Sequence, residues 1–444
     1  MLKQVEGSRA VAEAVAACRP QVICAYPITP QTHIVEALGA LVKQGELNAQ
    51  FMNVESEFAA MSAVIGASAA GARAYTATAS QGLLYMSEAV YNAAGLGLPV
   101  VMTVANRAIG APINIWNDHS DAMSQRDAGW IQLYAETNQE AADLHVQAFR
   151  IAEELSNPVM VCMDGFLLTH ASERVDPPAQ EQVDAFLPRY QPRQVLDPDD
   201  PVSIGAMVGP EAFTEVRFLA EMRMRQALDL IPAVAADFGQ RFGRPSGGFR
   251  GVVPPEQHSG LVRPYLTADA ELIVVALGSV LGTIKDTVDE LRADGIRAGV
   301  LGITSFRPFP AAAVRAALDG DRRLRRLVVI ERALAPGSGG IVTADLRAAL
   351  AAADGGTPLA GNTIISTVIA GLGGRPVTSK SLRPALIAAQ HGALAPFSYL
   401  DLREDLAEAE LARMRTARRS GPSAENMLRD LSLMAPGAPE WDWE

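Results

Sequence analysis

The feature that most restricts the fold is a regular alternation of short apolar runs and helix-like segments over residues 8–165. Such alternation predicts a parallel sheet with helices on both faces. We therefore predict an α/β fold with a doubly wound parallel sheet. The expected strands are 22–26, 51–54, 74–78, 99–105 and 158–163, and the expected helices are 8–18, 32–42, 57–70, 83–95 and 139–155.

The loops that follow these strands are the first place to look for a site, because open α/β sheets bind ligands at the carboxyl ends of their strands. Four loops qualify, and they should gather along one edge of the sheet. They are residues 27–31, 54–57, 80–82 and 106–121.

A second α/β unit is expected after a Gly- and Pro-rich boundary at 243–264. The predicted organisation is a first domain over 1–242, a linker over 243–264, a second domain over 265–394 and a C-terminal extension over 395–444. The extension ends in Glu440-Trp441-Asp442-Trp443-Glu444. We expect it to contact a partner subunit, with simple disorder as the alternative.

Composition excludes several classes of function. A net charge of −12 argues against broad nucleic-acid binding, which requires basic surface. No uncharged apolar run reaches about 18 residues, and the first residues lack the apolar core of a signal peptide, so we expect a cytoplasmic protein without a membrane span. The three cysteines form no CxxC pair and the six histidines no HxxxH pair, so we expect neither an iron–sulfur cluster nor a metal site in this chain.

Two of the loops carry groups suited to a small ligand. In Tyr26-Pro27-Ile28-Thr29-Pro30, two prolines stiffen the turn and present the Thr29 hydroxyl. A plain helix-entry turn is the alternative. Glu57 follows the next strand at a helix start, where a carboxylate either enters a cleft or only complements the helix dipole.

The other two loops add backbone donors and a cation. Ser80 and Gln81 lie at a strand-to-helix turn whose N–H groups could bind an anion or a ring. Arg107 follows the strongly apolar strand 99–105, where its guanidinium could bind a carboxylate or could form a structural salt bridge to Asp118 or Asp121.

Taken in order, the segments YPITP, ESEFAA, TATASQG, VANRAIGAPINIWNDHSD and MDGF resemble the N-terminal domain of pyruvate:ferredoxin oxidoreductases and the α subunits of related 2-oxoacid:ferredoxin oxidoreductases. The resemblance is strong over residues 8–170 and weaker over 265–375. It implies a thiamine-diphosphate pyrimidine-binding domain followed by a transketolase C-terminal-like domain.

The resemblance also implies roles for individual residues. Glu57 corresponds to the catalytic glutamate that hydrogen-bonds the aminopyrimidine of thiamine diphosphate. Thr29 and Arg107 correspond to residues that hold the 2-oxoacid carboxylate. Residues expected to line the cleft or touch the cofactor are Tyr26, Pro27, Ser80, Gln81, Asn114, Trp116 and Asp118.

The absence of one motif from the sequence is also informative. The chain contains no GDG motif of the kind that holds Mg²⁺ and the diphosphate in thiamine enzymes. The resemblance therefore implies a β subunit that shares the thiamine diphosphate and supplies Mg²⁺, with 4Fe-4S clusters in partner subunits. The expected partners are β, γ and ferredoxin-like δ subunits, and also a flavoprotein subunit if NAD replaces ferredoxin as acceptor. Coenzyme A is the expected co-substrate.

The implied activity is CoA-dependent oxidative decarboxylation of a 2-oxoacid, with pyruvate as the default. Gln31, Thr32 and Trp116 stand where pyruvate enzymes usually carry other residues. A branched-chain 2-oxoacid oxidoreductase and an NAD-coupled phenylglyoxylate dehydrogenase are therefore alternatives. Two further alternatives remain. One is a thiamine enzyme that works without iron, and the other is a catalytically inert assembly subunit.

Overall fold

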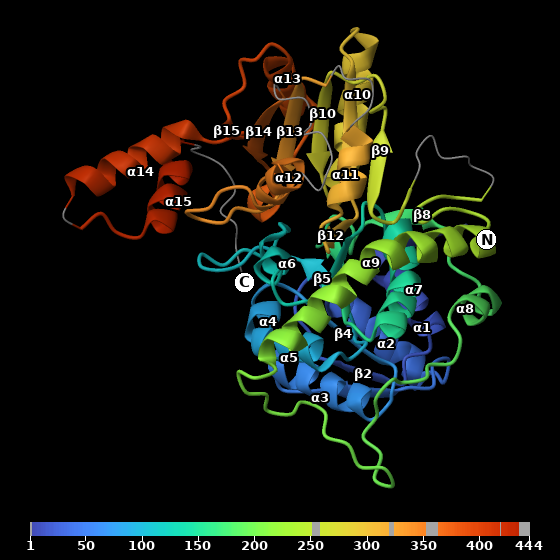
Figure 1. Cartoon of the computed structure of the whole chain (residues 1–444). Helices are drawn as coiled ribbons and strands as arrows, with labels where there is room; N and C mark the ends of the chain where they lie inside the picture. Colours follow the sequence, from blue (N-terminus) through green and yellow to red (C-terminus); the bar gives the residue numbers. More distant parts are fainter. Residues whose placement is uncertain (1, 251–257, 319–323, 352–362, 418, 435–444) are drawn as a thin grey trace. The chain divides into compact units, whose positions relative to one another are not determined.

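The computed structural model describes residues 2–250, 258–318, 324–351, 363–417 and 419–434 (Figure 1). The chain forms two compact units, Met1–Ser398 and Tyr399–Glu444. The first unit contains two mainly parallel sheets covered by helices, which confirms the predicted α/β class. The predicted partner-binding segment at Trp441 and Trp443 lies outside the described residues.

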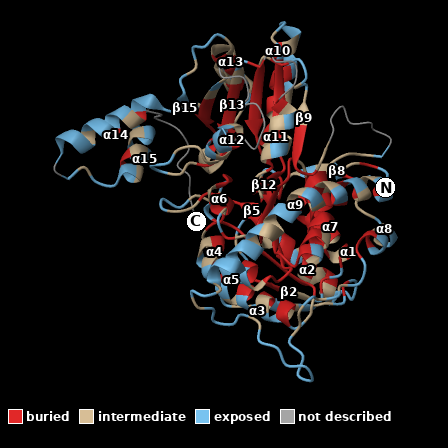
Figure 2. Cartoon of the chain, viewed as in Figure 1, coloured by how far each residue is buried: buried red, intermediate tan, exposed pale blue. Residues whose placement is uncertain are grey.

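The first sheet has seven strands in the order β12-β6-β7-β5-β4-β2-β3. All neighbouring strands pair in parallel except β12, which is antiparallel to β6. The central strands are buried along their whole length (Figure 2). The strands are β2(Val22–Ala25), β3(Gln50–Asn53), β4(Ala74–Thr78), β5(Val101–Asn106), β6(Ile131–Tyr134), β7(Val159–Asp164) and β12(Ser305–Arg307).

Alternate residues of these strands face two different helix layers, as a period of two requires. Ile23 and Ala25 pack in one hydrophobic core and Cys24 in the other. The first core includes side chains of α1(Gly7–Ala17), α2(Thr32–Lys43), α7(Asn138–Leu155), α8(Gln180–Phe186) and α9(Phe213–Phe242). The second includes side chains of α3(Glu57–Ala69), α4(Ser80–Tyr85), α5(Ser87–Leu96) and α6(Ser120–Ser124).

Local details differ from the expected elements. Ser8 lies inside the first turn of α1, and its hydroxyl donates to the Thr169 carbonyl rather than capping the helix. The single helix expected over 83–95 is two helices, α4 and α5, joined at Met86. In this part of the chain the sequence did not predict β6, β12 or the antiparallel pair formed by β1(Lys3–Glu6) and β8(Ser172–Val175).

The second sheet has the order β15-β14-β13-β10-β11-β9. Its parallel strands alternate with helices, while β9 runs antiparallel to β11. β9 begins at Val262, so the expected linker 243–264 already contains part of this sheet. The elements are β9(Val262–Tyr265), β10(Leu272–Ala276), α10(Val280–Ala293), β11(Ala298–Ile303), α11(Ala311–Leu318), β13(Arg326–Glu331), α12(Ile341–Ala351), β14(Ile364–Ile369), η1(Leu372–Gly374), α13(Ser379–Gln390) and β15(Phe397–Tyr399).

The second compact unit contains two helices, α14(Glu404–Thr416) and α15(Ser423–Met434). Glu410 of α14 is buried and accepts hydrogen bonds from Asn426 of α15. Arg413 donates to Asp430 at 2.9 Å. These polar contacts join the helices, while several leucines on them remain exposed: Leu411, Leu428, Leu431 and Leu433.

Among the described residues, no helix combines the length and the apolar character that a membrane crossing requires.

Candidate functional site

The loops after β2, β3, β4, β5 and β7 lie at the carboxyl edge of the first sheet, because these strands are parallel. They carry every residue that the sequence singled out for chemistry. The contacts among them fall into two groups. One is centred on Arg107 and the other on Glu57, and Ser80 connects the two.

Arg107 is buried at the end of β5, with 6% of its surface exposed. Its Nε donates to the Asn114 carbonyl at 3.1 Å, and Nη1 donates to the Thr29 carbonyl at 2.9 Å. Within the described part of the chain no carboxylate forms an ion pair with the guanidinium, so the predicted alternative of a salt bridge to Asp118 or Asp121 is not what holds it. Burial lowers the pKa of Arg107, and the nearby Asp121 opposes that effect. A buried cation without a paired anion is a candidate anion site.

Asp121 holds the surrounding loops together. Its Oδ2 accepts the backbone N–H of Ser80 and of Arg107, each at 2.9 Å. Its Oδ1 accepts from the Asn106 side chain and from its neighbour's N–H in α6, each at 2.8 Å. Burial raises the pKa of Asp121 to about 6, against the opposing effect of these four hydrogen bonds. The sequence suggests Asp121 as a salt-bridge partner of Arg107 within a loop that lines the cleft, but not as an acceptor for these backbone groups.

The loop after β2 presents Tyr26, Pro27 and Thr29 at the surface. Thr29 is next to Arg107 through its carbonyl. Pro30 is buried and packs against Gly165 at the end of β7, where a β-carbon would come within 2.5 Å of the proline ring. The loop is therefore fixed on one side by β7 and on the other by the arginine.

Gln31 does not have the substrate-selecting position that its departure from the family pattern suggested. It is fully buried, and its Nε2 donates to the Ala77 carbonyl at 2.6 Å and to the Tyr26 carbonyl at 3.3 Å. Gln31 thus ties the loop after β2 to β4.

Glu57 is the first residue of α3, and only 7% of its surface is exposed. The Ser56 hydroxyl caps the helix by accepting from the Ala59 N–H at 3.2 Å, so the Glu57 carboxylate is not needed as a cap. No hydrogen bond to the Glu57 carboxylate is present among the described residues. The carboxylate faces Gly82, where a β-carbon would be 2.5 Å from Glu57 Oε1 and 2.7 Å from Thr78 Oγ1. The Thr78 hydroxyl is also buried without a partner in the described chain.

Ser80 connects the two groups. It follows Thr78 by two residues, has a left-handed backbone with φ of 48°, and donates its N–H to Asp121. Its hydroxyl also contacts the Gln81 side chain and the Ala108 carbonyl. Gln81 lies close to Gly110, where a β-carbon would be 2.6 Å from its Nε2. Both predicted residues thus lie between the loops after β4 and β5.

The remaining three predicted cleft residues face the Gly-rich turn after β14. Asn114 Nδ2 donates to the Gly373 carbonyl at 3.2 Å, and Asp118 Oδ2 accepts from the Gly373 N–H at 3.1 Å. Trp116 lies against Gly374, keeps 51% of its surface exposed and contacts Phe166 at a ring distance of 4.7 Å. The loop 106–121 therefore joins the two sheets as well as bordering the site.

A buried ionic cluster that the sequence did not reveal joins the carboxyl ends of both sheets beneath this loop. Asp164, the last residue of β7, accepts from His119 at 2.6 Å and from Arg332 at 2.7 Å. Ser279, after β10, also donates to it. Burial opposes ionisation of Asp164, but Arg332 and His119 outweigh it and hold the pKa of this carboxyl well below its usual range. The cluster fixes the base of the loop that carries Asn114, Trp116 and Asp118.

A cavity of about 540 Å³ lies elsewhere, between α9 and the segment around β12. Four arginines and three acidic residues line it, and it includes none of the predicted site residues: Arg126, Asp127, Arg217, Glu221, Arg225, Arg307 and Asp345. Its size alone does not make it the chemical centre, because the buried Arg107 guanidinium and Glu57 carboxylate are at the sheet edge and not in this cavity.

Comparison with known families finds two adjoining matches. Residues 13–235 match the family described as pyruvate flavodoxin/ferredoxin oxidoreductase, thiamine diphosphate-binding. Residues 270–382 match pyruvate:ferredoxin oxidoreductase core domain II. Together they include strands β2 to β7 and β12 of the first sheet and β10, β11, β13 and β14 of the second.

Individual relatives cover most of this chain and nearly all of their own length. Pyruvate synthase subunit PorA of Methanosarcina barkeri is 46% identical over 410 residues, which is 90% of this chain and 97% of the relative. The same subunit of Thermotoga maritima is 41% identical over 405 residues, which is 90% and 98%. Ketoisovalerate oxidoreductase subunit VorA of Pyrococcus abyssi is 38% identical over 382 residues, which is 86% and 91%.

A solved structure resembles the fold. It is 2-oxoglutarate:ferredoxin oxidoreductase from Magnetococcus marinus, with 2-oxoglutarate, coenzyme A and succinyl-CoA bound. The TM-score is 0.64 at 18% identity, and the match covers 86% of this chain and 64% of that one.

Proposed function

The chain belongs to the pyruvate flavodoxin/ferredoxin oxidoreductase family, and from that premise we propose that it is the α subunit of a multi-subunit, CoA-acylating 2-oxoacid oxidoreductase. In the proposed reaction a 2-oxoacid and coenzyme A give an acyl-CoA and CO₂. Two electrons leave one at a time through iron–sulfur clusters of other subunits to ferredoxin. Pyruvate is the first substrate to test, because the relatives from M. barkeri and T. maritima are pyruvate synthase subunits.

The observation that carries this proposal is the Arg107 guanidinium. It is buried, held by the carbonyls of Thr29 and Asn114, and lacks a carboxylate partner in the described chain. Carbonyl oxygens orient a guanidinium without neutralising it, so the charge remains for an anionic ligand. A 2-oxoacid carboxylate satisfies that requirement. Since this carboxylate leaves as CO₂, Arg107 must position it without stabilising the bound ground state too strongly.

The residues around Glu57 fit an aminopyrimidine ring. The Glu57 carboxylate and the Thr78 hydroxyl are both buried without a described partner, and both approach Gly82 closely because this residue has no side chain. Thiamine diphosphate, when bound, would supply the electron sink for decarboxylation. Glu57 would hold its aminopyrimidine through a carboxyl hydrogen bond, and Ser80 and Gln81 would border the ring.

The other half of the site is proposed to come from a β subunit, because this chain has no GDG motif to hold Mg²⁺ and the diphosphate. The proposed complex also contains γ and ferredoxin-like δ subunits. All three cysteines of this chain are buried and free, so the 4Fe-4S clusters are assigned to partners. We also propose that the chain divides into 1–242, a linker 243–264 in which β9 of the second sheet already begins, 265–394 and 395–444. The exposed leucines of α14 and α15 support a partner contact by the last of these.

A branched-chain 2-oxoacid is the second candidate substrate. The VorA relative, named for ketoisovalerate, is 38% identical across 91% of its length. Trp116 borders the site and is half exposed, so its ring is free to contact a side chain larger than a methyl group. A panel of 2-oxoacids, each assayed with ferredoxin, viologen and NAD, separates pyruvate, branched-chain and phenylglyoxylate activities.

The deciding experiment compares Glu57→Gln and Arg107→Ala in the complete complex. Glu57→Gln should abolish 2-oxoacid-dependent viologen reduction while the complex still assembles. Arg107→Ala should raise KM and lower kcat/KM by 10-fold or more, because a charge-assisted contact is worth about 1.5–3 kcal/mol.

Glu55→Gln is the matched control for the first variant, because Glu55 is exposed two residues away. Near-normal activity of Glu57→Gln would remove Glu57 from the cofactor site. Unchanged kinetics of Arg107→Ala on every 2-oxoacid tested would remove Arg107 from the substrate site.

A further inference from the structure

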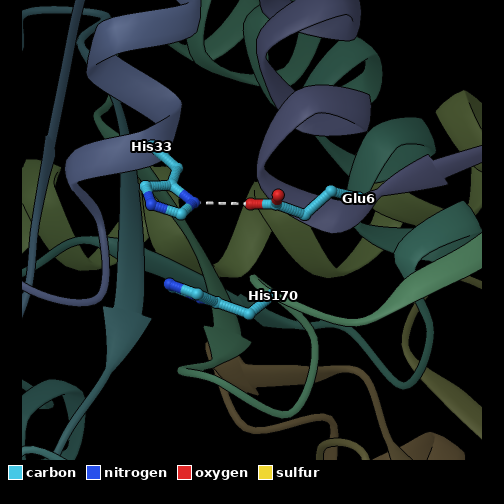
Figure 3. Close-up of side chains that lie close together, drawn as sticks. All are labelled: Glu6, His33 and His170. Carbon is cyan, nitrogen blue, oxygen red and sulfur yellow. Dashed lines mark hydrogen bonds and ion pairs between the residues drawn. The ribbon is translucent and has the colours of Figure 1, made fainter.

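A second group of chemically capable side chains lies outside the proposed active site. Glu6, His33 and His170 come from three separate segments and meet at the surface (Figure 3). Each offers one ligand atom, and the three atoms lie within 4.8 Å of one another. His33 Nδ1 is 2.7 Å from Glu6 Oε1. The rings of His33 and His170 are 4.5 Å apart and inclined by 33°.

We propose that Glu6, His33 and His170 form a binding site for a divalent transition-metal ion of the zinc type. Two imidazoles and one carboxylate are a recurrent ligand set for Zn²⁺. Bonds of about 2.0–2.2 Å require tetrahedral ligand atoms to be about 3.3 Å apart. Small side-chain rotations would bring the three ligand atoms from their present spacing to that distance. The His33–Glu6 hydrogen bond would open to admit the ion. Water would complete the coordination.

The orientation of His170 supports this assignment. Its Nδ1 is 2.7 Å from the Thr169 hydroxyl, which in turn accepts the Phe166 N–H at 2.8 Å. Phe166 also packs on the His170 ring at 4.7 Å. A histidine whose Nδ1 is hydrogen-bonded has its Nε2 available for a metal, and such a second contact fixes the ring.

The position of the site gives the ion a structural consequence. Glu6 ends β1 and His33 is the second residue of α2, four residues after Thr29. His170 follows the turn at Gly165 on which Pro30 packs. An ion here would therefore hold together the N-terminal strand and the two loops that border Thr29. This consequence is separate from the identity of the reaction.

Competing ligands in the chain are few. Among the described residues, no other group of three His, Cys, Asp or Glu side chains has this spacing. All three cysteines are buried, and burial raises the pKa of each thiol, Cys24 to about 11. Zn²⁺ bound by the folded chain should therefore report on the histidine site.

The test is a Zn²⁺ titration of the full-length chain by calorimetry, with thermal unfolding as a second readout. The parent should bind one equivalent and unfold at a higher temperature with Zn²⁺ present. His33→Ala and His170→Ala should each weaken binding by at least about 10-fold and remove the thermal shift. Glu6→Gln keeps a hydrogen-bond acceptor for His33 but loses the anionic ligand, so it should also weaken binding.

His391→Ala is the matched control, since His391 is exposed at the end of α13. It should leave the affinity unchanged. Hydrogen exchange should show slower exchange on Zn²⁺ addition in residues 2–8, 26–34 and 165–171. The proposal is overturned if the parent takes up no Zn²⁺, or if the two histidine variants bind it as tightly as the parent. If an alanine variant unfolds, His33→Gln and His170→Gln replace it.

Discussion

At the scale of single residues, the site depends on one carboxylate, Asp121, whose role as an acceptor for backbone groups was not recognised from the sequence. Asp121 accepts the N–H groups of Ser80 and Arg107 and the side-chain amide of Asn106. Asp121 therefore fixes the backbone of Ser80, just after β4, and of Arg107, just after β5. Its contribution is to position Arg107, since it makes no ion pair with the guanidinium.

Asp121→Ala should destabilise the protein and displace Arg107. The change leaves several buried donors without an acceptor, each costing about 1–3 kcal/mol. We expect a loss of several kcal/mol in the free energy of unfolding, measured by chemical denaturation. Asp127→Ala is the control, because that side chain is 71% exposed and its ion pair with Arg126 is long, at 4.0 Å. Equal stability of the two variants would contradict the role given to Asp121.

Sequence reasoning placed Thr29, Glu57 and Arg107 at one edge because parallel strands share a carboxyl edge. It did not find the roles of Gln31 or Asp121. The reason is physical: both act on backbone atoms of other loops, such as the Ala77 carbonyl and the Ser80 N–H. Backbone atoms are the same in every residue, so no sequence pattern identifies such partners.

At the scale of elements, α3 and α4 approach so closely that Gly82 has no room for a side chain beside Glu57. Gly82→Ala should therefore shift the Glu57 carboxylate and reduce 2-oxoacid oxidation strongly, with the fold retained. Activity of the assembled complex and circular dichroism measure the two effects. In α3, Gly66→Ala is the matched control because a β-carbon there meets no atom within 4 Å. Gly66→Ala should keep full activity and gain up to about 1 kcal/mol of stability.

The strand β12 shows why some elements were missed. It has three residues and pairs with β6 from far along the chain, Ser305 opposite Leu133. The central strands β4, β5 and β7 of the first sheet were predicted because they are long and apolar. A three-residue strand offers no period to detect, and its existence depends on tertiary contacts.

Phe306→Ala should weaken the attachment of β12. The ring is fully buried and meets Tyr134 edge-on at 6.1 Å. Removing it should cost about 3–5 kcal/mol and increase proteolysis between the two sheets. Phe309→Ala is the comparison, since Phe309 is only partly buried and should cost less. Identical denaturation curves for parent and Phe306→Ala would refute the packing role.

At the scale of the whole molecule, ion pairs join α7 and the turn that precedes it to β9 and α10 of the second α/β unit. Arg263 donates to Glu136 at 2.6 Å and contacts Glu140, and Lys285 donates to Glu136 at 3.0 Å. Burial acts to raise the pKa of Glu140, but Arg263 and His258 outweigh it and lower the value to about 2. These pairs join the two sheets within one compact unit, although composition suggested a boundary at 243–264.

The Glu140 pKa predicts a pH dependence. Because the folded value lies below the ordinary value of 4.5, the stabilisation is complete above about pH 4.5 and is lost as the pH falls toward 2. It amounts to about 3 kcal/mol. Glu140→Gln should lower the unfolding temperature at pH 7, and its difference from the parent should shrink below pH 4.5.

Glu154→Gln on the same helix is the control, since its pair with Arg150 is surface-exposed and should contribute less than about 1 kcal/mol. A difference between parent and Glu140→Gln that does not change between pH 7 and pH 3 would contradict the assignment of this pKa to Glu140.

The pairing of β12 with β6 also has a consequence for synthesis. While the chain emerges from the ribosome, the edge of β6 at Leu133 has no partner until Ser305 has been translated and released. An open strand edge is a template for pairing with another chain. The nascent first sheet is thus unfinished for most of translation, and a truncated product ending near residue 242 would expose that edge permanently. A fragment of residues 1–242 should be poorly soluble when expressed alone. Coexpression with a fragment of residues 243–444, which supplies β12, should restore its solubility.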